Sequence, residues 1–151
     1  MTSHAEFRIL HRMPRHARIV IPGLPHHITQ RGNNRQDVFF VDEDRVSYLT
    51  LLRQQCLKHR VRVLGYCLMT NHVHLVVTPP KEDSLNLAIG RTHFLYTQHI
   101  NRLHGRSGHL WQGRFHSCAM DETYTMAAMR LSYVPEPGNS ELLQDLTNVV
   151  L

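Results

Sequence analysis

The chain has 151 residues and a formal net charge of +5, which suits one domain with a single buried core. It has no run of 18 apolar residues, so no membrane-spanning helix is predicted. Its three cysteines are odd in number and widely spaced, which argues against a disulfide scaffold and favours a reducing, cytoplasmic setting. Residues 1–12 lack the apolar core of a secretory signal, and we expect a disordered N-terminal extension there.

The basic residues are almost all arginines and are unevenly distributed. Residues 1–36 carry six arginines and one acid, and residues 84–120 carry four arginines, five histidines and no acid. Arginine offers a planar fork for phosphate and a surface that stacks on bases. This distribution predicts contact with a polyanion, with nucleic acid as the first candidate, and an ordinary basic surface is the alternative.

The predicted elements follow in chain order. A short strand ends at Gly32, and residues 33–35 form a polar turn. Asp42 is expected to cap a helix that runs to about residue 59, with two further acids in its first turn. Strands at residues 61–68 and 73–77 form a hairpin through a two-residue connection at 70–71. A longer helix opens at residues 81–84 and ends near Gly105, a strand covers 115–120, and a final helix capped by Asp121 or Thr123 runs to about residue 132.

The order strand, helix, strand, strand, helix, strand, helix predicts an α+β fold. Split β-α-β units of this kind give a ferredoxin-like sheet with helices packed on one face. We expect this domain to cover residues 13–133. Residues 134–151 contain two helix-breaking prolines and are expected to be a diverged or truncated C-terminal tail.

Two histidines stand two residues apart in the strand that follows residue 71. Strand alternation puts His72 and His74 on one face, and it puts Val73, Leu75 and Val77 on a core face. The two imidazoles lie about 6–7 Å apart along the strand and can converge on one divalent ion. The alternative is that they are half-exposed polar strand residues. His26 and His27 alternate as well, so one of them is expected to face the same side as the pair.

A metal on these histidines would suit phosphoryl-transfer chemistry. A bound divalent ion lowers the charge repulsion that protects a phosphodiester from attack. A tyrosine hydroxyl can then act as the in-line nucleophile and form a phosphotyrosine link, or a metal-bound water can hydrolyse the ester. Composition does not choose between the two.

Three blocks of sequence, PHHITQRGN at 25–33, GYCLMTNHVHLV at 65–76 and GRSGHLWQGRF at 105–115, carry a family resemblance. The chain resembles the single-tyrosine transposases of single-stranded DNA with an HUH motif, and within them the REP-associated tyrosine transposases. The likeness covers roughly residues 13–130. It implies a ferredoxin-like fold with Mg²⁺ or Mn²⁺ on His72 and His74, and a tyrosine that stays bound to the 5′ phosphate while a 3′ hydroxyl is freed. Rejoining then needs no ATP, and the substrate is a hairpin of folded single-stranded DNA.

The chain departs from this family pattern at the nucleophile. Where the pattern places tyrosine this sequence has Leu131, and Pro135 stands in the slot of an asparagine that helps to complete the metal site. Tyr133 lies two residues later, which on a helix turns the side chain by about 200°. We expect Tyr133 or, failing that, Tyr124 to be the nucleophile.

The sequence thus predicts a transposase or nickase, and two alternatives stay open: a catalytically weakened DNA-binding protein of the same fold, and a metal-dependent phosphodiesterase. The expected partner is single-stranded DNA with hairpin structure, and no membrane partner is expected. The protein is expected to be a monomer or homodimer, cytoplasmic and nucleoid-associated. Trp111 would stack on a base or plug the core edge. Phosphate contacts are expected from four arginines, Arg31, Arg35, Arg106 and Arg114.

Overall fold

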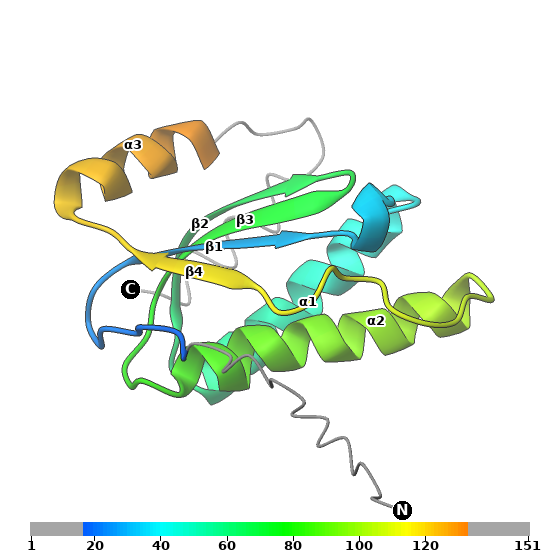
Figure 1. Ribbon diagram of the computed structural model, residues 1–151, viewed down its shortest axis with the longest axis horizontal. Helices are drawn as coiled ribbons and strands as arrows, with labels where there is room; N and C mark the ends of the chain where they lie inside the picture. The colour runs from blue at the N-terminus through cyan, green and yellow to red at the C-terminus, as the bar shows by residue number, and fades with distance from the viewer. Residues whose placement is uncertain (1–16, 133–151) are drawn as a thin grey trace, which may run out of the picture.

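The computed structural model describes residues 17–132 (Figure 1). The expectations for residues 1–12, for Tyr133 and for residues 134–151 therefore lie outside the described residues. Within residues 17–132 no helix is both long and apolar enough to cross a membrane. The elements in chain order are β1 (His26–Arg31), η1 (Asn33–Arg35), α1 (Asp42–Lys58), β2 (Arg62–Met69), β3 (His72–Thr78), η2 (Asn86–Gly90), α2 (Arg91–Leu103), β4 (His116–Ala119) and α3 (Glu122–Ser132).

The four strands form one antiparallel sheet in the order β2-β3-β1-β4. This is the order that split β-α-β units produce, so the α+β prediction is confirmed. The predicted hairpin of β2 and β3 is also present, and only residues 70 and 71 separate its strands. β1 lies in the middle of the sheet, where it pairs with β3 on one side and β4 on the other.

Helices cover both faces of the sheet. Figure 1 shows α1 and α2 on one face, as predicted, and α3 across the other, where it contacts β2 and β3. The prediction of helices on one face therefore describes α1 and α2 but not α3. Hydrophobic periodicity says which side of a helix is buried, but it does not say against which face of a sheet the helix packs.

The main core lies between the sheet and the helices α1 and α2. The predicted core face of β3 is confirmed, because Val73, Leu75 and Val77 are all fully buried. Tyr48 of α1 meets Tyr96 of α2 edge to face, with ring centroids 5.2 Å apart. Two large aromatic rings in this geometry contribute about 0.5–1.5 kcal/mol beyond the area that they bury.

The first turn of α1 is capped by a different acid from the one predicted. Asp42 is exposed and pairs with Arg45, whereas the buried Asp44 accepts hydrogen bonds from the N–H groups of Phe40 (2.8 Å) and Val41 (3.1 Å). Val41 is the residue that precedes the helix. The acid at the third helical position therefore reaches back to the chain, as in one half of a capping box.

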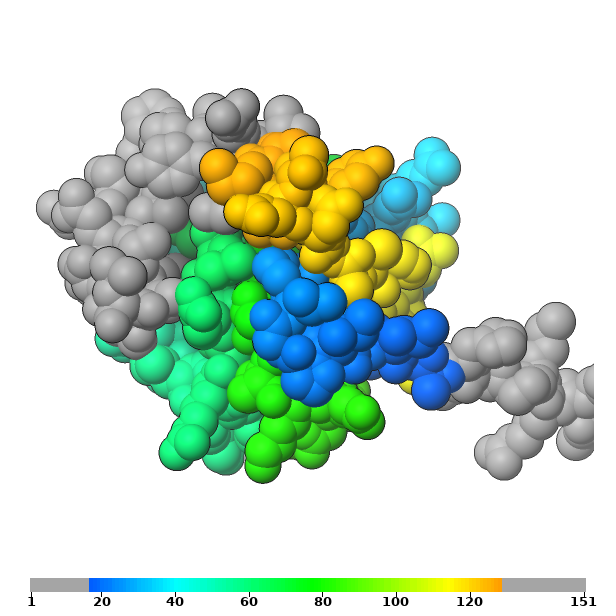
Figure 2. All heavy atoms as spheres, turned by 90° about the vertical axis from the view of Figure 1, so that its left-hand side faces the viewer, coloured from blue at the N-terminus to red at the C-terminus, as the bar shows by residue number. Residues whose placement is uncertain are grey.

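The other helices begin close to their predicted positions. Asp121 caps α3 as expected, since its Oδ1 accepts the N–H of Tyr124 at 2.8 Å. The predicted helix from 81–84 to Gly105 is divided into a π turn, η2, and the α-helix α2. Residues 17–25 close the end of the sheet at which α3 begins, and Figure 2 shows them in blue below α3. Here the N–H of Gly23 donates to Pro79, and the N–H of Met120 donates to Pro25.

Candidate metal and nucleic-acid site

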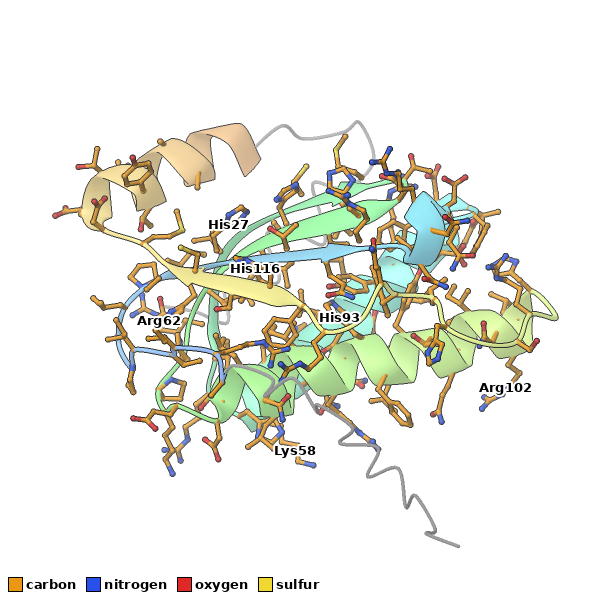
Figure 3. The ribbon with its side chains drawn as sticks, in the orientation of Figure 1. His27, Lys58, Arg62, His93, Arg102 and His116 are labelled. Atoms are coloured by element: carbon orange, nitrogen blue, oxygen red, sulfur yellow. The ribbon has the colours of Figure 1, made fainter. Side chains whose placement is uncertain are left out.

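Four histidines share the face of the sheet on which α3 lies. His72 and His74 come from β3, His27 from β1 and His116 from β4. In the strand register Thr29 stands opposite both His74 and His116, so alternation aims all four imidazoles to one side. In Figure 3 His27 lies on this side of the sheet, away from α2.

The structure brings the two predicted metal ligands together. The ring centroids of His72 and His74 are 5.0 Å apart and the ring planes are 80° apart. Both residues are half-buried. Two rings at this separation can direct one nitrogen each toward a common point above the sheet.

Each of the two imidazoles uses its Nδ1 atom in a hydrogen bond. His72 Nδ1 lies 2.7 Å from the side-chain oxygen of Asn71, and His74 Nδ1 lies 2.9 Å from Nε2 of His27. Within residues 17–132 no hydrogen bond engages the Nε2 atom of either ligand. Neutral imidazole nitrogen is a good ligand for divalent metals, so this donor pair fits a divalent ion.

The electrostatics of the site favour neutral imidazoles. Burial lowers the pKa of His74, and the neighbouring His27 and His72 lower it further. Burial also lowers the pKa of His27, with His116 as the second cause. A lowered histidine pKa leaves the ring neutral near pH 7, and the neutral ring is the form that binds a metal.

The two histidines do not form a complete protein cage. Among the described side chains no group of three His, Cys, Asp or Glu residues is arranged to hold a metal ion. The side chains of residues 17–132 alone would therefore leave a divalent ion on His72 and His74 with positions for water, for oxygens of a substrate or for a further side chain. Open positions of this kind are typical of catalytic metal sites and not of structural ones.

Three of the predicted phosphate-contact residues gather at the end of the sheet that holds His72. Arg31 ends β1 and stands opposite His72 in the register. Arg35 lies in η1, where its carbonyl oxygen accepts the side-chain amide of Asn71 at 3.4 Å. Arg106 donates to the side chain of Gln36, directly after η1.

The other two predicted DNA contacts lie elsewhere. Arg114 is exposed and close enough to Arg18 to contribute to the lowered pKa of that guanidinium, after burial. Trp111 is 7% exposed, and its indole N–H donates to the carbonyl of His93. The indole is therefore packed at the edge of the core, which is the second of the two roles expected for it. Little of its surface is accessible to a base.

One of the two candidate nucleophiles lies within the described residues. Tyr124 lies in the first turn of α3 and is 69% exposed. Tyr133 is the first residue beyond the described range.

The sequence patterns did not predict two features of this site. These are the place of His116 on the histidine face and the hydrogen bond of Asn71 to His72. It left open whether His26 or His27 would face the pair. His26 is fully buried and bonded to the N-terminal segment, so His27 is the one that faces the pair. The alternation of side chains along β4 can be predicted from the sequence, but the strand register that places His116 near His27 cannot.

Comparisons with known proteins show the family and the fold of this chain. A search of curated proteins found no match. Among solved structures, a REP-associated tyrosine transposase bound to a REP hairpin has a TM-score of 0.59 and 15% identity, over 80% of this chain and 71% of that one. A putative transposase from Deinococcus radiodurans has a TM-score of 0.53 and 19% identity, over 78% of this chain and 94% of that one. The family described as "Transposase IS200 like" matches residues 21–136, and this chain belongs to that family.

Proposed function

We propose that this protein cuts and rejoins one strand of hairpin DNA through a covalent 5′-phosphotyrosine, with Mg²⁺ or Mn²⁺ held by His72 and His74. The observation that carries the proposal is the pair of imidazoles whose ring centroids lie 5.0 Å apart on the sheet face that α3 crosses. Membership of the IS200-like family and a solved relative bound to a REP hairpin support it.

Metal binding and phosphate binding would fall to different residues of this chain. His72 and His74 would hold the ion through their Nε2 atoms. The chemistry that a bound divalent ion supplies is withdrawal of charge from the attacked phosphate. Arg31 stands opposite His72, and Arg35 contacts the neighbouring Asn71 through its carbonyl oxygen. Both arginines would bind phosphates that flank the scissile bond and so hold this bond over the histidines.

The attacking oxygen belongs to a tyrosine. Its hydroxyl gives up a proton, its oxygen bonds to phosphorus, and the 3′ oxygen of the preceding nucleotide leaves and takes a proton. The reverse attack by a 3′ hydroxyl rejoins the strand and frees the tyrosine, with no change in the number of phosphodiester bonds.

The direction of α3 favours Tyr133 over Tyr124. α3 follows β4 after two residues, and Ala119 at the end of β4 pairs with His26, at the opposite end of the sheet from His72. The 11 residues of α3 span about 16 Å, close to the roughly 17 Å of strand from Val77 to His72. Because α3 contacts β2 and β3, its C-terminal end can approach the histidines, and Tyr124 starts at the far end.

The test uses a pool of single-stranded hairpin oligonucleotides with randomised flanks, labelled at the 5′ or the 3′ end, with Mn²⁺ and the full chain. We expect the 3′ label to migrate with the protein on a denaturing gel and the 5′ label to appear on a shortened free strand. Tyr133→Phe should abolish the adduct, and Tyr124→Phe is the matched control that should keep it. A free 3′-labelled fragment would identify hydrolysis by water instead.

A second candidate function rests on Leu131, which stands where the family resemblance places the nucleophile. In that case the protein binds hairpin DNA without cutting it. Gel-shift binding that weakens steeply with salt, together with no adduct in Mg²⁺ or Mn²⁺, would select this function over cleavage.

A further inference from the structure

We propose that Asn71 and His27 are positioning residues that hold His72 and His74 in the one tautomer able to bind a metal through Nε2. This inference rests on the proposed function of the two histidines as metal ligands. Neither positioning residue would touch the ion. Each would act through the Nδ1 atom of the ligand beside it.

The hydrogen bonds of Asn71 fix the tautomer of His72. The carbonyl oxygen of Arg35 can only accept, so the Asn71 atom that faces it must be the amide nitrogen. The other end of the amide, 2.7 Å from His72 Nδ1, is therefore the oxygen, which also only accepts. His72 must then carry its proton on Nδ1, and the lone pair of Nε2 is free.

Asn71 is held in place by the backbone as well. It belongs to the two-residue connection of the β2–β3 hairpin, and its carbonyl oxygen accepts the N–H of Gly32 at 2.8 Å. These contacts fix the main chain from which the amide reaches His72. The side chain that orients the ligand therefore starts from an anchored turn.

His27 can do the same for His74. A hydrogen bond between two neutral imidazole nitrogens needs one donor and one acceptor, and the 2.9 Å contact joins His27 Nε2 to His74 Nδ1. If His27 donated, the proton of His74 would sit on Nε2 and block the metal. If His27 accepts, His74 Nδ1 donates and Nε2 is free, so the metal-binding arrangement requires His27 as the acceptor.

The main chain holds His27 in this position. Its strand is one of the two inner strands of the sheet, and His27 stands opposite Val76 of β3 and Cys118 of β4. The rings of His27 and His74 are nearly parallel, with 11° between their planes. Both ligands thus have a partner on Nδ1 that is fixed by the fold, which is how outer-shell groups orient metal-bound histidines in general.

Two measurements on the full chain test the inference. The first is calorimetric titration with Mn²⁺ alone. His27→Phe and Asn71→Ala each remove the acceptor and should weaken binding roughly 10- to 100-fold. Asn71→Asp keeps an acceptor oxygen and should restore most of the affinity, and His109→Gln, which changes an exposed imidazole that does not belong to the four-histidine face, should leave it unchanged.

The second measurement needs no metal and no variant. Long-range ¹⁵N–¹H NMR at pH 8 reports which ring nitrogen carries the proton, and we expect the Nδ1–H form for both His72 and His74. An Nε2–H form of either ring in the wild-type protein would overturn the inference for that ring. Mn²⁺ binding by His27→Phe and Asn71→Ala that is as tight as binding by the wild-type protein would also overturn it. If the wild-type chain bound no Mn²⁺ at all, the proposed metal function would fail, while the tautomers would still decide the positioning roles.

Discussion

Arg31 stands directly opposite His72 across the β1–β3 pair, so a guanidinium and a candidate metal ligand share one end of one sheet face. Nucleic-acid backbones are polyanions, and their affinity for a protein depends on how many phosphates the protein neutralises. The pairing of these two strands therefore places a phosphate-binding group beside the proposed site of phosphoryl transfer.

This arrangement predicts how DNA binding depends on salt. Replacing Arg31 or Arg35 by Gln should weaken hairpin binding and reduce the slope of log K against log salt by about 1 for each residue. Arg102→Gln is the matched control, because Arg102 lies at the C-terminal end of α2 and away from the histidine face (Figure 3). The measurement is a salt series of gel shifts. Equal slopes for all three variants would remove Arg31 and Arg35 from the interface.

The cap of α1 predicts a large difference between two neighbouring acids. Asp44→Ala should destabilise the protein by about 1–3 kcal/mol, because the N–H groups of Phe40 and Val41 lose their charged acceptor. Asp42→Ala, at an exposed carboxylate, should change the free energy of unfolding by no more than about 0.5 kcal/mol. Urea denaturation of both variants measures this, and equal effects would contradict the assignment of the cap.

Asp44 also predicts a pH dependence. Burial raises the pKa of its carboxyl, but the hydrogen bonds from Phe40, His104 and Val41 outweigh burial and the net pKa is lowered. A lowered carboxyl pKa stabilises the fold above the unfolded value of 3.8, and this stabilisation is lost as the pH falls through the folded pKa. The Asp44→Asn variant should therefore lose less stability than the wild type when the pH falls below about 4.

His93 predicts a loss of stability at a higher pH. Burial lowers its pKa from 6.5 to about 3, with Arg18 as the second cause, and its ring is hydrogen-bonded to the hydroxyl of Tyr48. The unfolded chain therefore takes up a proton that the folded chain excludes, and stability falls as the pH drops from 6.5 toward 3. His93→Phe should flatten this part of the curve, whereas His109→Gln, at an exposed site, should not. A His93→Phe curve as steep as that of the wild type would contradict the buried neutral ring.

Gly32 predicts a steric effect at the end of β1. A Cβ atom there would lie 2.1 Å from the carbonyl oxygen of Gln36, so η1 would have to move. Gly32→Ala should destabilise the protein by about 1–3 kcal/mol and, because η1 carries Arg35, also weaken hairpin binding. Gly90→Ala serves as the control, because the atom nearest to the added Cβ is the side-chain oxygen of Asn86 at 3.3 Å. Thermal unfolding of both variants checks the difference.

Local pattern was enough to predict much of this molecule. The alternation of Val73, His74 and Leu75, together with the two-residue turn before them, predicts the hairpin, its core face and the shared side of the two histidines. The order of elements predicts the sheet, because split β-α-β units have few ways to pair. These features depend on residues that are close in the chain.

The remainder depends on contacts between distant segments. His27 meets His74 only because β1 pairs with β3 in one register, and a shift by one residue would turn His27 to the other face. The three consecutive acids at the start of α1 gave no local reason to choose Asp44 over Asp42. The face covered by α3 and the burial of Trp111 follow from packing between elements, which the sequence pattern does not predict.

The central claim is that His72 and His74 hold a divalent ion, and anomalous X-ray diffraction from crystals soaked in Mn²⁺ tests it most directly. The account predicts one strong manganese peak at bonding distance from the Nε2 atoms of both histidines, absent in crystals of His72→Ala. A manganese peak elsewhere on the protein with none between these two rings would contradict it.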